Sequence, residues 1–79
     1  MTPEEKDKVI SCAKRYMPAL QDGDDSEFEN YGLDSISAIS LIIDIETLFG
    51  FEFDDDDLIF SKFNTLEKLL DIVEKNRTR

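Results

Sequence analysis

Apolar residues recur at helical spacing in three stretches of the chain. The first stretch follows a capping box formed by Thr2 and Glu5, with Pro3 in the first turn, and this combination predicts the start of a helix. Its apolar stripe comprises Val9, Ile10, Ala13, Tyr16, Met17 and Leu20. Pro18 is expected to end or bend the helix, because proline lacks the N–H that helical hydrogen bonding requires.

A second helix is predicted from Ile36 to Phe49. Asp34 suits its N-cap, and Gly50 suits the position just after its last turn. The stretch is longer than a usual strand and is apolar nearly all round. Such a helix must be buried on most sides or must present a face to a partner.

A third main helix and a short one are predicted near the C-terminus. Thr65 caps the last helix, whose apolar positions are Leu66, Leu69, Leu70 and Val73. Before it, the four aspartates 54–57 favour a short helix through residues 58–60, because carboxylates stabilise a helix N-terminus.

A long polar loop covers residues 21–33, and its apolar members Phe28, Tyr31 and Leu33 are expected to pin it to the core. The pattern therefore predicts a small all-α fold. It has three main helices, one short helix and a long first loop, in a single domain over residues 1–79.

Charge divides the chain into unequal parts. It has 9 basic and 19 acidic residues, a formal net charge of -10. All basic residues lie in 6–15 and 62–79, so residues 16–61, which we call the acidic segment, carry thirteen acids and no base. Such a chain repels phosphate backbones and anionic lipid, so we expect no nucleic-acid binding and no membrane insertion. Basic partner surfaces should attract it.

Several functional classes are disfavoured by what the sequence lacks. It has no histidine, the commonest general base and metal ligand, so self-contained hydrolase or zinc chemistry is not expected. Cys12 is the only cysteine, which excludes an internal disulfide and suits a partly buried structural thiol. No signal segment or membrane-spanning run occurs, so the expected location is the cytoplasm.

The aspartate-rich stretches do not match a calcium loop. Counted from Asp22 or from Asp54, the glycine at position 6 and the carboxylate at position 12 of an EF-hand are both missing. No metal site is therefore expected, and the run 54–57 is interpreted as a solvated, helix-capping run.

The segment Gly32-Leu33-Asp34-Ser35-Ile36 is the candidate functional site. Ser35 falls in the first turn of the second helix, where free backbone N–H groups and the helix dipole suit a phosphate ester. Serine is also an ordinary residue at helix starts, and spacing alone favours that structural role. No histidine exists and the acidic segment has no Lys or Arg, so another protein must supply any catalytic groups.

Residues 31–58, YGLDSISAISLIIDIETLFGFEFDDDDL, resemble the core of the acyl and peptidyl carrier protein family. Asp34-Ser35-Ile36 is similar to that family's Asp-Ser-Leu/Ile signature, and the closing Leu-Phe-Gly at 48–50 is similar too. The resemblance implies a right-handed four-helix bundle with 4′-phosphopantetheine on Ser35 and with Asp34 as the helix cap of the motif. The arm would come from coenzyme A through a separate phosphopantetheinyl transferase that uses Mg²⁺.

The resemblance also implies a monomeric carrier rather than an enzyme. It would hold acyl or aminoacyl intermediates as thioesters in fatty-acid, polyketide or nonribosomal peptide biosynthesis. Its partners would be the transferase and adenylating, acyltransferase or synthase enzymes with basic or apolar docking faces. A D-alanyl-type carrier and an unmodified acidic helical adaptor or inhibitor protein remain the alternatives.

The second helix departs from fatty-acid carriers, in which acidic residues follow the serine closely. Ser37 and Ser40 occupy the early polar positions here, so this face is apolar and neutral, more similar to carriers of peptide synthetases. The acidic stretch 52–57, however, exceeds what is usual in peptidyl carriers. The cargo class therefore stays open. The predicted docking residues are Ile36, Ile39, Asp44, Glu46, Asp55, Asp56 and Phe60.

Overall fold

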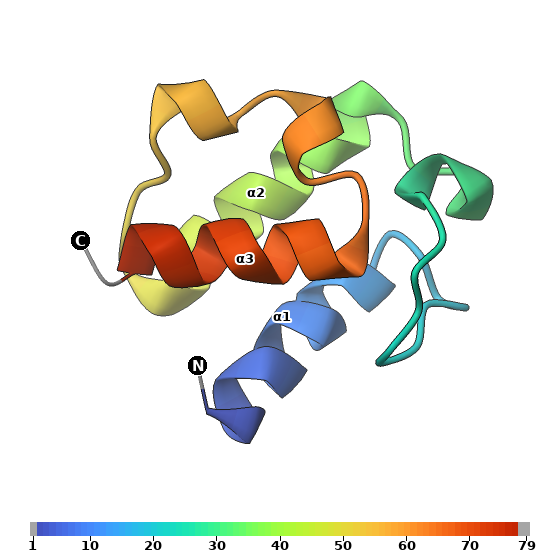
Figure 1. The fold of residues 1–79 in the computed structure, drawn as a ribbon, viewed down its shortest axis with the longest axis horizontal. Coiled ribbons are helices and arrows are strands. Elements are labelled where there is room, and N and C mark those ends of the chain that lie inside the picture. Colours follow the sequence, from blue (N-terminus) through green and yellow to red (C-terminus); the bar gives the residue numbers. More distant parts are fainter. Residues whose placement is uncertain (1, 78–79) are drawn as a thin grey trace.

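The three apolar stretches each form an α-helix. In the computed structural model, which describes residues 2–77, α1 spans Pro3–Lys14, α2 spans Ser35–Phe49 and α3 spans Leu66–Arg77 (Figure 1). Three short 3-10 helices lie in the connections: η1 at Phe28–Tyr31, η2 at Asp55–Asp57 and η3 at Phe60–Lys62. The predicted all-α class is confirmed. No helix within residues 2–77 combines the length and the apolar character needed to cross a bilayer.

Helix starts and ends follow the predicted caps. Oγ1 of Thr2 accepts a hydrogen bond from the Glu5 N–H (3.2 Å), and the Glu5 carboxylate accepts one from the Thr2 N–H (3.0 Å). Thr65 caps α3 by accepting from the Lys68 N–H at 3.2 Å. Gly50 ends α2 at φ +71, a left-handed conformation that glycine adopts without steric cost.

The first helix is shorter than its apolar stripe. It ends at Lys14, because Pro18 disfavours helical backbone at the residue before it, Met17. The Met17 N–H still donates to the Ala13 carbonyl at 2.9 Å, and both Met17 and Leu20 remain fully buried. The apolar stripe therefore predicted burial correctly although it overestimated the length of the helix.

A single hydrophobic core joins the helices and the first loop. Its members on the three helices are Val9, Ile10, Cys12, Ala13, Ala38, Leu41, Ile42, Ile45, Leu66, Leu69, Ile72 and Val73. Phe28 and Leu33 of the loop are buried in the same core, as predicted. Burial raises the pKa of the Cys12 thiol, which agrees with a structural role.

Residues 51–65 cross from the end of α2 to the start of α3 without the predicted helix through 58–60. That prediction is wrong: the aspartates themselves form η2, and the backbone leaves the helical region at Leu58 (φ -87, ψ 34). The physical reason is that Asp57 bonds to Lys75 and Asn76 of α3, which fixes the chain where the helix would have continued. Asp57 is buried, so a fully solvated aspartate run is also wrong.

Ion pairs connect the basic ends of the chain to the acidic segment. They are Lys6–Asp22 (3.0 Å), Arg15–Asp44 (3.8 Å) and Lys75–Asp57 (3.1 Å). The ends therefore neutralise part of the negative charge that the middle of the chain cannot compensate itself.

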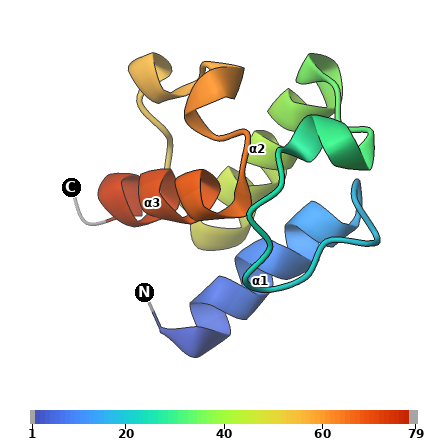
Figure 2. The ribbon, with the colours of Figure 1, turned by 45° about the vertical axis from the view of Figure 1, so that its right-hand side comes forward.

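Arg77 connects the ends of the three helices. Its guanidinium forms an ion pair with Glu5 in the first turn of α1 and lies over the ring of Phe49 at the end of α2, 5.1 Å from the ring centroid. The first turn of α1 and the last turn of α3 are therefore neighbours, and they lie on the same side of the molecule (Figure 1 and Figure 2).

Candidate functional site

Ser35 is the first residue of α2, and it is exposed. Asp34 before it has extended backbone (φ -99, ψ 175), and its Oδ1 accepts a hydrogen bond from the Ser37 N–H at 2.7 Å. This hydrogen bond lowers the pKa of Asp34 below its ordinary value, because it stabilises the ionised carboxylate. Asp34 therefore acts as the predicted N-cap, and its carboxylate is directed to the helix backbone.

The backbone before Ser35 is anchored to the core by η1. Gly32 ends η1 at φ +84, in the left-handed region, and the Leu33 N–H then donates to the Phe28 carbonyl at 3.2 Å. The Phe28 N–H donates in turn to the Asn64 carbonyl at 2.7 Å. Since Phe28 and Leu33 are both buried, the hydroxyl of Ser35 is presented from a fixed segment.

The solvent side of α2 carries isoleucines and no charged residue. Ile36, Ile39 and Ile43 are 79%, 43% and 53% exposed, and their spacing places them on one side of the helix. We call these three residues the isoleucine face. Ser40 and Thr47 are exposed on the same side. Neighbouring exposed aliphatic side chains indicate a binding surface.

Ile43 was missed by sequence reasoning, which proposed Ile36 and Ile39 as the only aliphatic docking residues on this helix. Its position seven residues after Ile36 could have revealed it, because that spacing returns to the same side of a helix.

Two acidic residues predicted for docking form contacts within the molecule. Oδ2 of Asp44 accepts a hydrogen bond from the Tyr16 hydroxyl at 2.6 Å, and Arg15 lies 3.8 Å from the same oxygen. Oε2 of Glu46 accepts from the Phe53 N–H at 2.9 Å. Both side chains are half-buried. Their carboxylates therefore attach α2 to its neighbours in the fold.

The remaining predicted docking residues lie on the segment that leads to α3. Asp55 and Asp56 are exposed in η2, whereas Phe60 is half-buried and packs edge-on against Phe63 with ring centroids 5.7 Å apart. Ile59, which sequence reasoning placed only in a short helix, is exposed. This segment lies on the same side of α3 as the first turns of α2 (Figure 1 and Figure 2).

The surroundings of Ser35 suit a group attached to its oxygen. The hydroxyl is exposed, the free N–H groups of the first turn lie beside it, and negative charge is favoured there by the helix dipole. Residues 16–61 supply no Lys or Arg, and the chain supplies no histidine, to activate it. Among residues 2–77, no three carboxylate or thiol groups are arranged to hold a metal ion. A phosphodiester delivered by another protein fits this position.

The comparison with known families agrees with this arrangement. A family model described as a phosphopantetheine attachment site matches residues 7–73, which include Ser35, all of α2 and most of α1 and α3. No curated protein matches the chain. The family implies a covalently bound 4′-phosphopantetheine cofactor. By this match over most of its length, the chain belongs to the phosphopantetheine attachment-site family, the carrier family that its residues 31–58 resemble.

Proposed function

We propose that this protein is a carrier whose phosphopantetheine arm is attached to Ser35. The observation that supports this proposal best is the exposed hydroxyl of Ser35 in the first turn of α2, directly after the capping residue Asp34. When bound, the arm supplies a thiol that holds an acyl or aminoacyl group as a thioester. The carrier itself performs no catalysis, and tethering raises the effective concentration of cargo at a partner's active site.

The residues around Ser35 hold the attachment point and favour its charge. The first-turn N–H groups of α2 stabilise the negative charge of a phosphodiester. Asp34 is directed to the Ser37 N–H, so it caps the helix without covering the serine. Phe28 and Leu33 anchor the preceding backbone, so the attachment point moves with the core rather than with a loose loop.

Partner enzymes are proposed to bind across the isoleucine face, with Asp55 and Asp56 steering their approach. Complete burial of one aliphatic side chain contributes about 1.5–3 kcal/mol, whereas an exposed ion pair contributes roughly 0–1 kcal/mol. The apolar contact therefore dominates affinity. The partners are the phosphopantetheinyl transferase and the enzymes that load or consume the cargo. Each would present an apolar docking patch with basic residues at its rim.

The test is modification of the purified protein by a broad-specificity phosphopantetheinyl transferase with coenzyme A and Mg²⁺. Intact-mass measurement should show one added phosphopantetheine on the wild type and none on Ser35→Ala. Ser40→Ala is the matched control, because Ser40 is an exposed serine on the same helix, and it should be modified fully.

Two results would contradict the proposal. Modification that persists in Ser35→Ala would place the arm elsewhere. A folded wild type that is never modified would favour the alternative of an unmodified acidic adaptor. Ser35→Ala should stay folded, since the serine is exposed and is not the cap, and its cost should be below about 1 kcal/mol.

A further inference from the structure

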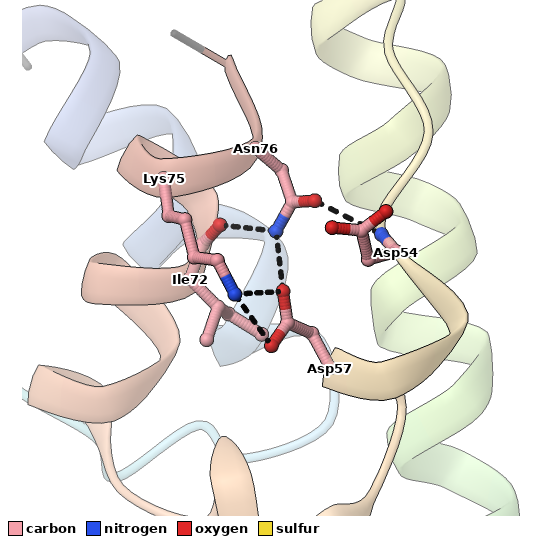
Figure 3. A network of polar contacts seen from close by, with 5 residues as sticks. All are labelled: Asp54, Asp57, Ile72, Lys75 and Asn76. Carbon is pink, nitrogen blue, oxygen red and sulfur yellow. Dashed lines mark hydrogen bonds and ion pairs between the residues drawn. The ribbon is translucent and has the colours of Figure 1, made fainter. Parts of the chain in front are cut away.

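Two polar side chains, Asp57 and Asn76, are buried within the described part of the chain, and they bond to each other. Asp57 is 3% exposed and Asn76 is 4% exposed. Nδ2 of Asn76 donates to Oδ2 of Asp57 at 3.0 Å, and Nζ of Lys75 lies 3.2 and 3.1 Å from the two carboxylate oxygens of Asp57 (Figure 3). Buried polar groups with this many partners are fixed in orientation, because losing any partner is costly.

Asn76 also bonds to the other end of η2. Its Oδ1 accepts a hydrogen bond from the Asp54 N–H at 2.9 Å, and its Nδ2 donates a second bond to the Ile72 carbonyl at 2.8 Å (Figure 3). One side chain from the last turn of α3 therefore holds both the residue before η2 and the last residue of η2. We call Asp54, Asp57, Lys75 and Asn76 the Asn76 network.

The segment held by this network contains two short helices, η2 and η3, of three residues each. Such short turns have little stability by themselves. Between and just after the two held positions lie the exposed residues Asp55, Asp56 and Ile59. Two contacts therefore place them: the packing of Leu58 and Phe60 against the core, and the attachment of η2 to α3.

We propose that Asn76 is a positioning residue of the docking surface. It fixes Asp55, Asp56 and Ile59 relative to Ser35, and it thereby determines how well a partner that contacts both regions binds. Asn76 itself is buried and does not touch the partner. This inference rests on the proposed carrier function, because it concerns the surface that partners of Ser35 use.

A purely stabilising role for Asn76 is separated from a positioning role by a matched variant. Val73 lies one turn earlier on α3, is fully buried and takes no part in the Asn76 network. Val73→Ala and Asn76→Ala should both lower the free energy of unfolding. Only Asn76→Ala should release η2 from α3.

The experiment measures transfer of a fluorescent coenzyme A derivative to Ser35 by a broad-specificity phosphopantetheinyl transferase, with the unmodified carrier as the varied substrate. For Asn76→Ala we expect the KM for the carrier to rise roughly three- to tenfold, as loss of one or two exposed contacts predicts, with kcat nearly unchanged. Val73→Ala should keep the wild-type KM. Amide hydrogen exchange in residues 54–63 should accelerate in Asn76→Ala more than in Val73→Ala.

The inference is overturned if Asn76→Ala keeps the wild-type KM, if its exchange in residues 54–63 stays at the wild-type rate, or if Val73→Ala raises KM as much. Should Asn76→Ala fail to fold, Asp57→Asn replaces it. That variant keeps the side-chain size and loses the ionic contact with Lys75. A rise in KM smaller than the one expected for Asn76→Ala supports the inference, and an unchanged KM overturns it. If the wild type is modified normally and the KM of Asn76→Ala is unchanged, only this inference fails and the proposed function stands. Wild type that is not modified overturns both.

Discussion

The hydroxyl of Tyr16, just beyond the end of α1, donates a hydrogen bond of 2.6 Å to the carboxylate of Asp44 in α2. The two residues are 28 positions apart in the chain, so this bond fixes how α1 and α2 pack. It raises the pKa of the Tyr16 hydroxyl, because the hydrogen bond to the carboxylate holds the phenolic proton. Arg15 lies 3.8 Å from the same carboxylate oxygen, so the two residues that follow α1 both contact Asp44.

Tyr16→Phe should destabilise the fold. It removes one hydrogen bond to a charged group, and a typical bond of this kind contributes about 1.5–3 kcal/mol. For a domain of this size, 1 kcal/mol corresponds to a fall in Tm of about 4–8 °C. Urea unfolding of Tyr16→Phe, Asp44→Asn and the double variant provides the test. The effect of Tyr16→Phe should shrink when Asp44 is already replaced, and two fully additive effects would show that the bond contributes nothing.

Stability should depend on the ionisation of Asp57. Hydrogen bonding from Asn76, opposed by burial and reinforced by Lys75, lowers the pKa of Asp57 below its ordinary value of 3.8. A carboxyl group whose pKa is lowered by folding stabilises the folded state at pH values above its unfolded-state pKa. That contribution is lost as pH falls below 3.8 and through the lowered pKa.

Urea unfolding between pH 7 and pH 2.5 measures this dependence. Asp57→Asn should be less stable than wild type at pH 7, and the difference between the two should narrow at the acid end. Asp55→Asn, which removes an exposed carboxylate of the same run, is the control and should follow the wild-type profile closely. If the difference in the free energy of unfolding between Asp57→Asn and wild type stays constant from pH 7 to pH 2.5, the ionised Asp57 does not stabilise the fold.

Added salt should raise thermal stability. Residues 16–61 hold thirteen acids and no base, and the ion pairs with the chain ends leave many of those acids exposed. Screening shortens the range of their mutual repulsion, from about 30 Å at 0.01 M to 10 Å at 0.1 M ionic strength. Tm measured by calorimetry over this range should increase, and divalent cations should have the larger effect. A flat or falling Tm would mean that the ion pairs outweigh the repulsion.

Replacing one residue of the isoleucine face should weaken partner binding at every salt concentration. Ile36→Ala should raise the KM of the transferase, or of the cognate loading enzyme, roughly tenfold, because apolar burial of this side chain is not screened. Its folding should be unaffected, since the side chain is 79% exposed. Leu48→Ala is the matched control, an exposed aliphatic residue of α2 outside the isoleucine face, and it should bind nearly as wild type.

The double variant Asp55→Asn with Asp56→Asn should behave differently from Ile36→Ala. It should slow association mainly at low ionic strength, because exposed charges act through long-range steering that salt screens. Measuring the rate of modification against salt separates the two effects. Normal modification of Ile36→Ala together with a failure of the double variant at all salt concentrations would show that recognition is electrostatic.

Local sequence signals predicted most of the elements and the position of Ser35. The cap at Asp34 and the capping box of Thr2 and Glu5 depend on residues three apart, so they form as soon as each helix does. Gly50 ends α2 for an equally local reason. The serine could therefore be placed in the first turn of α2 from the sequence alone.

The Asn76 network could not be predicted in the same way. It joins Asp57 to Asn76, 19 residues apart, and a pattern within one helix carries no information on which loop will cover it. One signal was present, since Asn76 continues the apolar stripe of α3 three residues after Val73 and seven after Leu69. A polar residue at a core position of a helix indicates a buried partner but does not identify it.

The ion pair between Glu5 and Arg77 has a consequence for how the domain can be connected to other sequences. It brings the first turn of α1 and the last turn of α3 together on one side of the molecule. A short flexible linker could join these ends, and new termini could be opened in the exposed turn at residues 21–23 without cutting a helix. For the same reason, the domain could be inserted into a surface loop of a host protein, leaving the host's two connection points close together.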